Sequence, residues 1–287
     1  MNILISVNKT YVDKVQTMLL SLSLNVKEMV TVYLMNHSLR EKDVLRLKKY
    51  LKEKCNFNLI EIDVKKTSLD DLPIYLHFSI EAIYRLLAQF LLPKTVDRVL
   101  WLDADIIILN DITEFYYQDF EEKLLIVCAD VNHDREDVHK IKQAMKISQE
   151  HTYFNSGVSL FNLTKLRAET TEEEIVEVCN RMKDKVMYVD QDILNYLYQF
   201  KVKYENPKKY NYQLTNDNFI EEKDLADICI LHYSGPRKPW DYKYINKTSK
   251  HYWNIKIKQG YILEYLKTMS FSLVYRGLKK IKRTIFK

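Results

Sequence analysis

Short apolar runs alternate along the chain with segments in which apolar residues recur every three or four positions. The apolar runs lie at residues 2–7, 30–34, 58–62, 99–102, 124–127 and 228–231, and they predict buried strands. The periodic segments lie at residues 15–22, 41–54, 80–92 and 164–184, and they predict helices. Because strands and helices alternate, the pattern predicts an α/β protein with a mainly parallel sheet flanked by helices.

Two further segments lie between these elements. Residues 131–150 are polar, and we expect them to form a mobile excursion from the core. Residues 153–162 return to the core, and Gly157 within them predicts a bulge or a close approach of the backbone to another group.

The apolar run 99–102 ends in two carboxylates, Asp103 and Asp105, which are separated by one residue. Alternate side chains of an extended strand point to the same side, so both carboxylates would face one spot. Two like charges there repel unless a cation lies between them, and hard oxygen ligands suit Mg²⁺ or Mn²⁺. The alternative is a strand that ends in a solvated acidic turn, and this pair alone does not exclude it.

Polar residues in apolar surroundings mark further candidate positions. Arg85 lies in an apolar helical run and needs an anionic partner, which is either a structural carboxylate or a ligand. Asp190 can cap the helix that it opens, whereas capping does not explain Gln191. His232 ends the last strand and precedes a glycine turn and Lys238, a combination that suits a metal and a diphosphate.

Composition limits the kinds of site that the chain can build. The chain has 287 residues, of which 47% are hydrophobic and 29% charged, as in a soluble globular protein. Its 4 glycines cannot form a dinucleotide-binding or Walker loop, so a phosphorylated ligand would need a metal and basic side chains. The 4 widely spaced cysteines predict reduced core residues of a cytosolic protein, and we expect neither a signal peptide nor a membrane span.

Several short motifs occur in an order that resembles glycosyltransferase family 8, the group that contains glycogenin and bacterial lipopolysaccharide galactosyl- and glucosyltransferases. The motifs are Tyr11, H-x-S-x-x-x-x-Y-R at 77–85, L-W-L-D-A-D at 100–105, F-N-S-G-V at 154–158, D-Q-D at 190–192 and H-Y-S-G-P-R-K-P-W at 232–240. The resemblance covers residues 1–255. It implies a single GT-A domain with one mixed, mainly parallel sheet. The implied activity moves a hexose (galactose or glucose) from a UDP-sugar to a glycan acceptor with retention, using Mn²⁺, with Mg²⁺ as the alternative ion.

The resemblance also implies roles for individual residues. By similarity, the metal ligands are Asp103, Asp105 and His232. The donor would contact Asn8, Tyr11, Arg85, Asp103, Ala104, Asp105, Asn155, Gly157, Asp190, Gln191, Gly235 and Lys238. The residues expected at the reacting sugar are Gln191, Asp190 and Arg85, and those expected near the acceptor are His77 and Asp130.

One position departs from the family pattern. Many relatives carry Asp where this chain has Asn8, and an amide offers different donors and acceptors to a uracil or ribose. Two other functions also use D-x-D sites or similar folds: a metal-dependent phosphohydrolase or nucleotidyltransferase, and a non-catalytic module that binds sugar nucleotides. Glycan-stimulated turnover of a sugar nucleotide would distinguish the transferase from both.

The end of the chain, residues 256–287, is expected to be a basic amphipathic helical tail. Residues 265–287 contain seven cations and no Asp or Glu. Because the whole chain carries +5, residues 1–264 carry a net −2, and the basic character belongs to the tail. Apolar residues interleave with these cations, which favours peripheral attachment to the anionic inner face of a bacterial membrane over binding to nucleic acid. The alternative is a helix that packs on the body and has a basic end.

Overall fold

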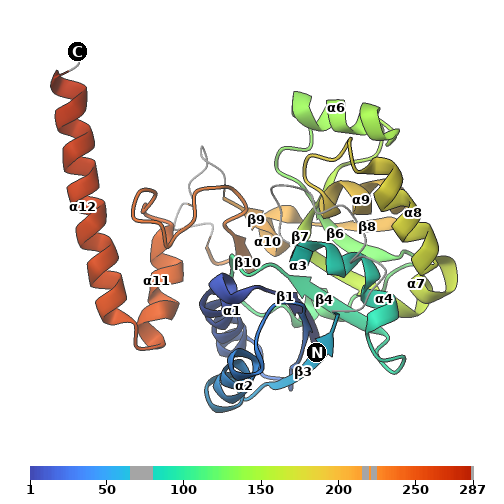
Figure 1. The fold of residues 1–287 in the computed structure, drawn as a ribbon, viewed down its shortest axis with the longest axis horizontal. Helices are drawn as coiled ribbons and strands as arrows, with labels where there is room; N and C mark the ends of the chain where they lie inside the picture. The colour runs from blue at the N-terminus through green and yellow to red at the C-terminus, as the bar shows by residue number, and fades with distance from the viewer. Residues whose placement is uncertain (65–79, 215–219, 221–224, 286–287) are drawn as a thin grey trace.

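A seven-stranded sheet forms the centre of the molecule in the computed structural model, which describes residues 1–64, 80–214, 220 and 225–285 (Figure 1). The strands, in order across the sheet, are β3 (Asn58–Asp63), β2 (Thr31–Asn36), β1 (Asn2–Ser6), β4 (Arg98–Leu102), β7 (Phe154–Asn162), β6 (Leu125–Ala129) and β8 (Val202–Glu205). Strand β7 runs antiparallel to β4 and β6, whereas the other neighbouring pairs are parallel. The predicted α/β architecture is therefore confirmed.

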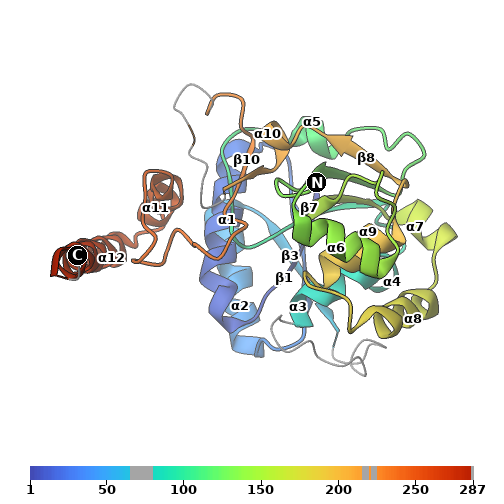
Figure 2. The same ribbon diagram turned by 90° about the horizontal axis from the view of Figure 1, so that it is seen from above.

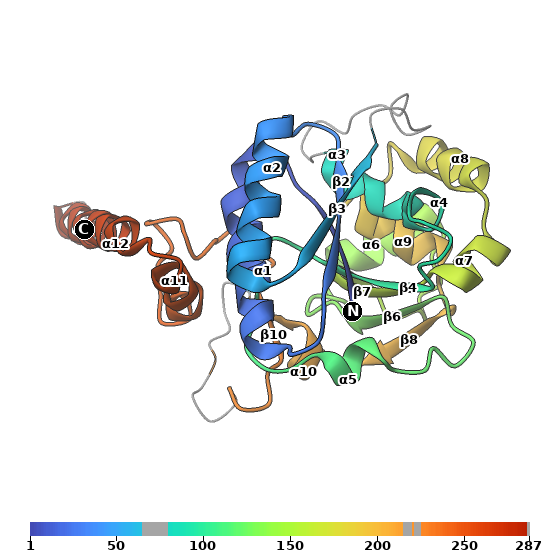
Figure 3. The ribbon, with the colours of Figure 1, turned by 90° about the horizontal axis from the view of Figure 1, so that it is seen from below.

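Helices cover both faces of this sheet (Figures 2 and 3). Helices α1 (Val12–Asn25) and α2 (Glu41–Tyr50) pack on one face, and α4 (Ala88–Leu91), α7 (Leu163–Glu169), α8 (Glu172–Met182) and α9 (Asp190–Leu197) pack on the other. Along β1, Ile3 and Ile5 belong to the first of two buried clusters, and Leu4 belongs to the second. Strands buried on both faces explain why the sequence shows continuous apolar runs and no polar alternation.

A small second sheet follows directly after the D-x-D sequence. It contains β5 (Ile106–Ile108), β10 (Ile230–His232) and β9 (Tyr212–Gln213), where β10 is antiparallel to β5 and parallel to β9. The sequence analysis expected one sheet, because the last apolar run does not reveal its partner. The pairing aligns His232 with Ile106, and it therefore brings the histidine next to the acidic pair.

Three segments, two of them predicted as helices, differ from their predictions. The predicted helix 80–92 consists of α3 (Ile80–Ile83), a 3₁₀ segment over Tyr84–Leu87 and α4. The predicted helix 164–184 is divided between α7 and α8, because Thr171 begins α8 with a capping box to Glu174. Residues 131–150 contain α6 (Glu136–Met145), whose Val138, Ile141 and Met145 are buried, so the expected excursion is partly an ordered amphipathic helix.

Shorter helical segments complete the body, and two helices end the chain. The short segments are η1 (Lys9–Tyr11), η2 (Leu51–Cys55), α5 (Thr113–Tyr116) and α10 (Pro207–Tyr210). Helix α11 (Ser249–Lys258) lies against α1, and α12 (Ile262–Ile285) stands on its far side, away from the sheet (Figures 1 and 2). In the described part of the chain, no helix is both long enough and apolar enough to cross a membrane. All four cysteines are buried and free, as expected for core residues.

Candidate active site

Three potential metal ligands meet beyond the end of β4. Asp103 and Asp105 follow this strand, and His232 ends β10. The Nε2 atom of His232 lies 3.3 Å from Asp105 Oδ1 and 3.8 Å from Asp103 Oδ2. One ligand atom from each residue lies within 4.8 Å of the other two. The two carboxylates thus share one spot, as predicted, but they lie in the turn between β4 and β5 and not along an extended strand.

Gly157 in β7 permits this close approach. A Cβ atom at this position would lie 2.4 Å from His232 Cε1 and 2.6 Å from Asp103 Oδ2, which is closer than atoms can pack. The carbonyl oxygen of Gly157 also accepts a hydrogen bond of 3.0 Å from the backbone N–H of Asp103. The structure therefore shows a close backbone approach, one of the two alternatives that the sequence predicted, and it lies at the candidate metal-ligand cluster.

The buried Arg85 connects the acidic pair to the start of α9. Its guanidinium lies 3.1 Å from Asp103 Oδ1 and 3.1 Å from Asp190 Oδ2, and it donates to the carbonyl oxygen of Ser156. It also stacks on Trp101, 4.0 Å from the ring centre, while the indole N–H donates to Asp103. These contacts supply the anionic partners that an arginine needs in an apolar helix. They show Arg85 as part of the framework of the site.

Lys238 and Gly235 lie on the loop that follows β10. The Lys238 ammonium contacts Asp105 Oδ2 and donates 2.7 Å to the carbonyl oxygen of Tyr233. Burial acts to raise the pKa of Asp105, but the nearby Lys238 and His232 outweigh it and lower this pKa well below its usual range. Asp105 is therefore an anion, and the Lys238 side chain lies beside the candidate metal-ligand cluster.

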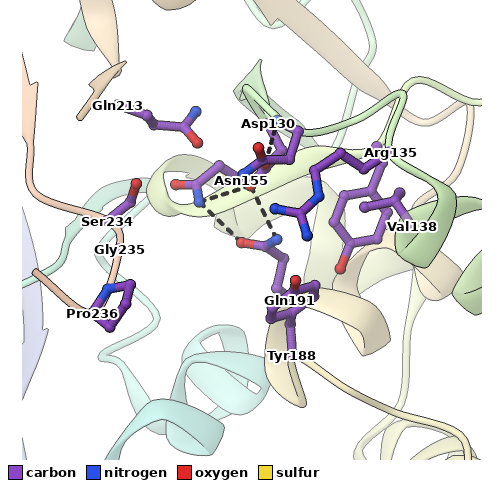
Figure 4. A pocket seen from close by; sticks show the side chains of 12 residues that line it. Asp130, Arg135, Val138, Asn155, Tyr188, Gln191, Gln213, Ser234, Gly235 and Pro236 are labelled. Carbon is purple, nitrogen blue, oxygen red and sulfur yellow. Dashed lines mark hydrogen bonds between the residues drawn. The ribbon is translucent and has the colours of Figure 1, made fainter. Parts of the chain in front are cut away.

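A polar cavity of about 320 Å³ (Figure 4) is lined in part by Asn155, whose side chain is linked through Asn211 to His232 of the cluster. Its lining includes Asp130, Asn155, Gln191 and Gly235, which the sequence analysis selected. The Gln191 side chain accepts from Asn155 Nδ2 at 3.1 Å and donates to Asp130 Oδ2 at 3.3 Å, as the dashed lines in Figure 4 show. Gln191 belongs to α9, Asn155 to β7, and Asp130 follows β6. Elements of the core therefore position these three polar side chains in the wall of the cavity.

A strained turn presents Asp190 and Gln191 to the site. Val189 has φ +43°, a conformation that branched side chains rarely adopt. The carboxylate of Asp192 accepts from the backbone N–H groups of Met187 and Tyr188, 2.6 and 2.7 Å away, and also from the Tyr153 hydroxyl. These three bonds stabilise the turn.

The carboxylate of Asp190 points into the site and does not cap α9. The residue before the helix makes no capping hydrogen bond, and Asp190 instead pairs with Arg85 and accepts from the Ser156 hydroxyl. The capping interpretation of Asp190 is therefore wrong. Burial raises its pKa to about 6, Arg85 opposes this shift, and the negative Asp103 adds to it.

The remaining candidates lie at the same edge of the sheet or outside the described residues. Asn8 follows β1, and its Oδ1 accepts from the backbone N–H and the hydroxyl of Thr10. Tyr11 packs edge-on against Trp240, with ring centres 6.2 Å apart, and so contacts the loop that carries Lys238. Ala104 lies between the two aspartates. His77, expected near the acceptor, lies outside the described residues.

Four buried polar residues of the site were not selected from the sequence. Asn211 bonds to His232 and Asn155, Gln213 lines the cavity, Ser156 contacts Asp190, and Asp192 stabilises the turn described above. Ser156 and Asp192 lie inside quoted motifs, so their position was a usable signal. Asn211 follows the short helix α10 and Gln213 lies in the two-residue strand β9, where no motif marks them.

Comparison with known proteins identifies the family. The sequence profile described as "Glycosyl transferase family 8" matches residues 2–244. The chain belongs to glycosyltransferase family 8. The predicted family and the predicted class of enzyme are thereby confirmed.

Curated relatives of this family 8 chain include lipopolysaccharide glucosyl- and galactosyltransferases. The lipopolysaccharide 1,2-glucosyltransferase of Escherichia coli K12 is 25% identical over 262 residues, which cover 88% of this chain and 76% of the relative. The lipopolysaccharide 1,3-galactosyltransferase of Salmonella typhimurium is 30% identical over 183 residues, which cover 60% of this chain and 52% of the relative. A putative glycosyltransferase of Haemophilus influenzae is 24% identical and covers 90% of this chain and 78% of itself. These relatives, among them a glucosyltransferase and a galactosyltransferase, support hexose transfer by this family member.

Solved structures show the same fold. A crystal structure of galactosyltransferase LgtC with donor and acceptor sugar analogues superposes with a TM-score of 0.76 at 24% identity, over 89% of this chain and 95% of LgtC. The glycosyltransferase GlyE of Streptococcus pneumoniae superposes with a TM-score of 0.67 at 20% identity, over 98% of this chain and 63% of GlyE. The likeness confirms the predicted GT-A fold.

Proposed function

We propose that this protein is a retaining hexosyltransferase that moves glucose or galactose from a UDP-sugar to a glycan acceptor and that requires Mn²⁺. The observation that carries the proposal is the position of the Asp103, Asp105 and His232 cluster beside a polar cavity. One end of the site suits a metal-bound diphosphate, and the other suits a sugar. Family membership agrees with both assignments.

The donor set of the cluster fits a divalent ion. Carboxylate oxygens suit both Mg²⁺ and Mn²⁺, and the imidazole nitrogen of His232 favours the transition metal of the two. The missing side chain of Gly157 leaves the three ligands room to converge. A bound ion would supply positive charge to the leaving diphosphate, and Lys238 would add a second cation at the same end.

The chain's own residues position the sugar at the other end. In the proposed transfer, the bond between the anomeric carbon and the diphosphate oxygen breaks, and its electron pair leaves with UDP. The acceptor oxygen forms a bond to the same face of that carbon, and its proton passes to the departing phosphate oxygen. Gln191, fixed by Asn155 and by the backbone N–H of Ser156 at 3.0 Å, would steady the opposite face of the sugar.

The nucleoside end of the proposed site lies beyond β1. Asn8, Tyr11 and Ala104 lie at the carboxyl edge of the sheet, where parallel α/β sheets bind ligands. The Asn8 amide carries both a donor and an acceptor, which can serve the polar edge of a uracil or a ribose hydroxyl. Asp130 and the outer part of the cavity would receive the acceptor.

The experiment that tests this function is a panel of UDP-sugars scored for UDP release with Mn²⁺, with Mg²⁺ and after chelation. We expect Mn²⁺-dependent UDP release that increases when a glycan acceptor is added. The anomeric configuration of the product, measured by NMR, tests retention. Metal-dependent hydrolysis that no acceptor stimulates would instead indicate a phosphohydrolase, and binding without turnover would indicate a non-catalytic module.

We also propose that residues 256–287 attach the catalytic body, residues 1–255, to the inner face of the membrane. One side of α12 faces the body. Tyr265 and Met269 on this side pack against the hydrophobic core of the body, and the Arg276 guanidinium donates a hydrogen bond of 2.7 Å to the carbonyl oxygen of Ile245. The opposite side carries an apolar stripe at helical spacing, formed by Leu263, Leu266, Leu273, Val274, Leu278 and Ile281, each more than half exposed. Packing of the helix on the body and attachment to a bilayer are therefore compatible, because they use different sides.

A further inference from the structure

We infer that Asn211 is a positioning residue that fixes the tautomer of His232 and so prepares this nitrogen ligand for the metal. The inference rests on the proposed metal site. Asn211 follows α10, is 1% exposed, and lies between His232 on one side and Asn155 on the other. No motif in the sequence marks it. Its role follows from the directions of the hydrogen bonds around it.

The chain of hydrogen bonds begins at Asn155, whose amide orientation is fixed from two sides. The backbone N–H of Gly157 donates 3.1 Å to Asn155 Oδ1, and Asn155 Nδ2 donates 3.2 Å to Asp130 Oδ2. A backbone N–H can only donate, and a carboxylate accepts. The oxygen of the Asn155 amide must therefore face Gly157, and its nitrogen must face Asp130.

This orientation determines that of Asn211. The Asn211 side chain meets Asn155 Oδ1 at 3.0 Å, and an oxygen there requires a donor, so Asn211 presents its NH₂ group. Its own oxygen then faces His232 Nδ1 at 2.9 Å. Because an amide oxygen accepts, His232 must carry a proton on Nδ1.

A proton on Nδ1 leaves Nε2 of the neutral imidazole with its lone pair toward the two aspartates. The competing tautomer would donate from Nε2 to Asp105 Oδ1, 3.3 Å away, and would place a bare Nδ1 against the oxygen of Asn211. Two acceptors at hydrogen-bond distance repel each other, so Asn211 keeps the proton on Nδ1. Without metal, Nε2 can share a second proton with Asp105 Oδ1; a bound cation would displace that proton and take the Nε2 lone pair, while Nδ1 stays protonated. A partner that fixes the second nitrogen in this way is common behind metal-binding histidines.

The first test is a measurement on the metal-free wild-type protein. Imidazole ¹⁵N shifts of histidine-labelled protein at about pH 8, with His232 assigned by loss of its signals in His232→Gln, report which nitrogen carries the proton. We expect the proton on Nδ1. A wild-type His232 with its proton on Nε2 and a bare Nδ1 would overturn the inference, whether or not any variant folds.

The second test compares Asn211→Ala with a matched control, Asn36→Ala. Asn36 is also buried, at 2% exposed, and bonds to the backbone of Leu39 through both its amide oxygen and its nitrogen, but it lies on β2 outside the site. We expect Asn211→Ala to increase the Nε2–H population and to weaken Mn²⁺ binding about 10- to 100-fold, measured by electron paramagnetic resonance with UDP present. The control should leave both quantities unchanged. Wild-type tautomer and Mn²⁺ affinity in Asn211→Ala would refute the role.

The two tests also separate this inference from the proposed function. If the wild-type protein binds neither Mn²⁺ nor UDP, the proposed function fails, while the shifts of His232 still decide the tautomer. Asn211→Asp provides a conservative variant, since it keeps an acceptor oxygen for Nδ1 but loses the donor to Asn155. We expect it to restore the Nδ1–H tautomer that Asn211→Ala loses. If His232 in Asn211→Asp instead showed the same tautomer populations as in Asn211→Ala, the contact of residue 211 with Nδ1 would not be what fixes the tautomer.

Discussion

Asp103 and Asp105 are two residues apart, but their carboxylates have different surroundings. Oδ1 of Asp103 is occupied by Arg85 and Trp101, so Oδ2 remains on the side of His232. Asp105 is 12% exposed and is compensated by Lys238 on one oxygen, while its other oxygen faces His232. An acidic turn in solvent, the alternative for this sequence, would have none of these partners. The two carboxylates are therefore held in place by cationic and polar partners, and they are not a solvated acidic turn.

At the level of this pair, we predict that Asp105→Asn abolishes Mn²⁺-dependent binding of UDP. The neutral amide keeps the size of the side chain but removes one anionic ligand, so the charge of the diphosphate is no longer compensated through the metal. Titration calorimetry of UDP with and without Mn²⁺ measures the effect, and circular dichroism controls for folding. Equal UDP affinity in the variant and the wild type would show that Asp105 is not a metal ligand.

Gln191 lines the polar cavity, whereas the two aspartates do not, so its substitution should affect a different quantity from theirs. We predict that Gln191→Ala lowers kcat by at least about tenfold and changes the affinity for UDP by less than about twofold, because its contacts concern the sugar. Steady-state kinetics and UDP titration measure the two values. An equal fall in both would place Gln191 at the nucleotide.

The raised pKa of Asp190 predicts a pH dependence of stability in the metal-free protein. Its folded pKa of about 6 exceeds the ordinary value of 3.8, so the folded state retains a proton that the unfolded state releases. The associated stability is complete below about pH 3.8 and is lost as the pH rises through about 6, at a cost of up to about 3 kcal/mol. Denaturant unfolding from pH 4 to pH 7 should show this loss in the wild type, and a smaller loss in Asp190→Asn. If the free energy of unfolding fell with pH to the same extent in both proteins, Asp190 would not be the source of the loss.

At the scale of elements, the turn before α9 depends on a buried carboxylate. Asp192 accepts three hydrogen bonds there, one of them from Tyr153. We predict that Tyr153→Phe lowers the free energy of unfolding by about 1.5–3 kcal/mol, as for a hydrogen bond to a charged group. Tyr198→Phe is a control for a buried tyrosine outside this turn. Because the Tyr198 hydroxyl meets the neutral Gln89, an equal loss in both variants would mean that the charge of Asp192 does not set the effect.

Several elements could be predicted from the sequence because a local pattern specifies them. The apolar runs before Asn8 and Asp103 became β1 and β4, since strands buried on both faces need continuous apolar residues. The division of α7 from α8 was missed although Thr171 and Glu174 form a capping-box pattern that was available. Helix α6 was missed because Val138, Ile141 and Met145 lie in a strongly polar background.

The candidate site was predictable where motifs carry it and unpredictable where tertiary contacts create it. The acidic pair, His232 and Gln191 were selected from sequence, and the structure places them around one cluster and its cavity. Asn211 was not, because its role depends on the orientation of Asn155 in a distant strand. A single sequence contains no local signal for such a contact.

At the scale of the whole molecule, α12 presents its apolar stripe away from the catalytic body. We predict that the full-length protein sediments with anionic vesicles but not with neutral ones, and that high salt releases much of it, because each cation contributes about 1 kcal/mol near an anionic surface. A form that ends at Glu264 should remain in the supernatant while it retains UDP binding. Equal partitioning of the two forms would show that the tail is not an anchor.

The register of β10 against β5 has a consequence for synthesis of the chain. Asp105 and Lys238 are 133 residues apart, and His232 reaches the acidic pair only when β10 aligns with β5. On the ribosome, Asp105 therefore emerges long before His232 and Lys238, the groups that compensate its charge. The metal-ligand cluster can be completed only after nearly the whole body has left the exit tunnel. Its appearance should thus coincide with the end of folding, and truncated nascent chains should contain no preformed site.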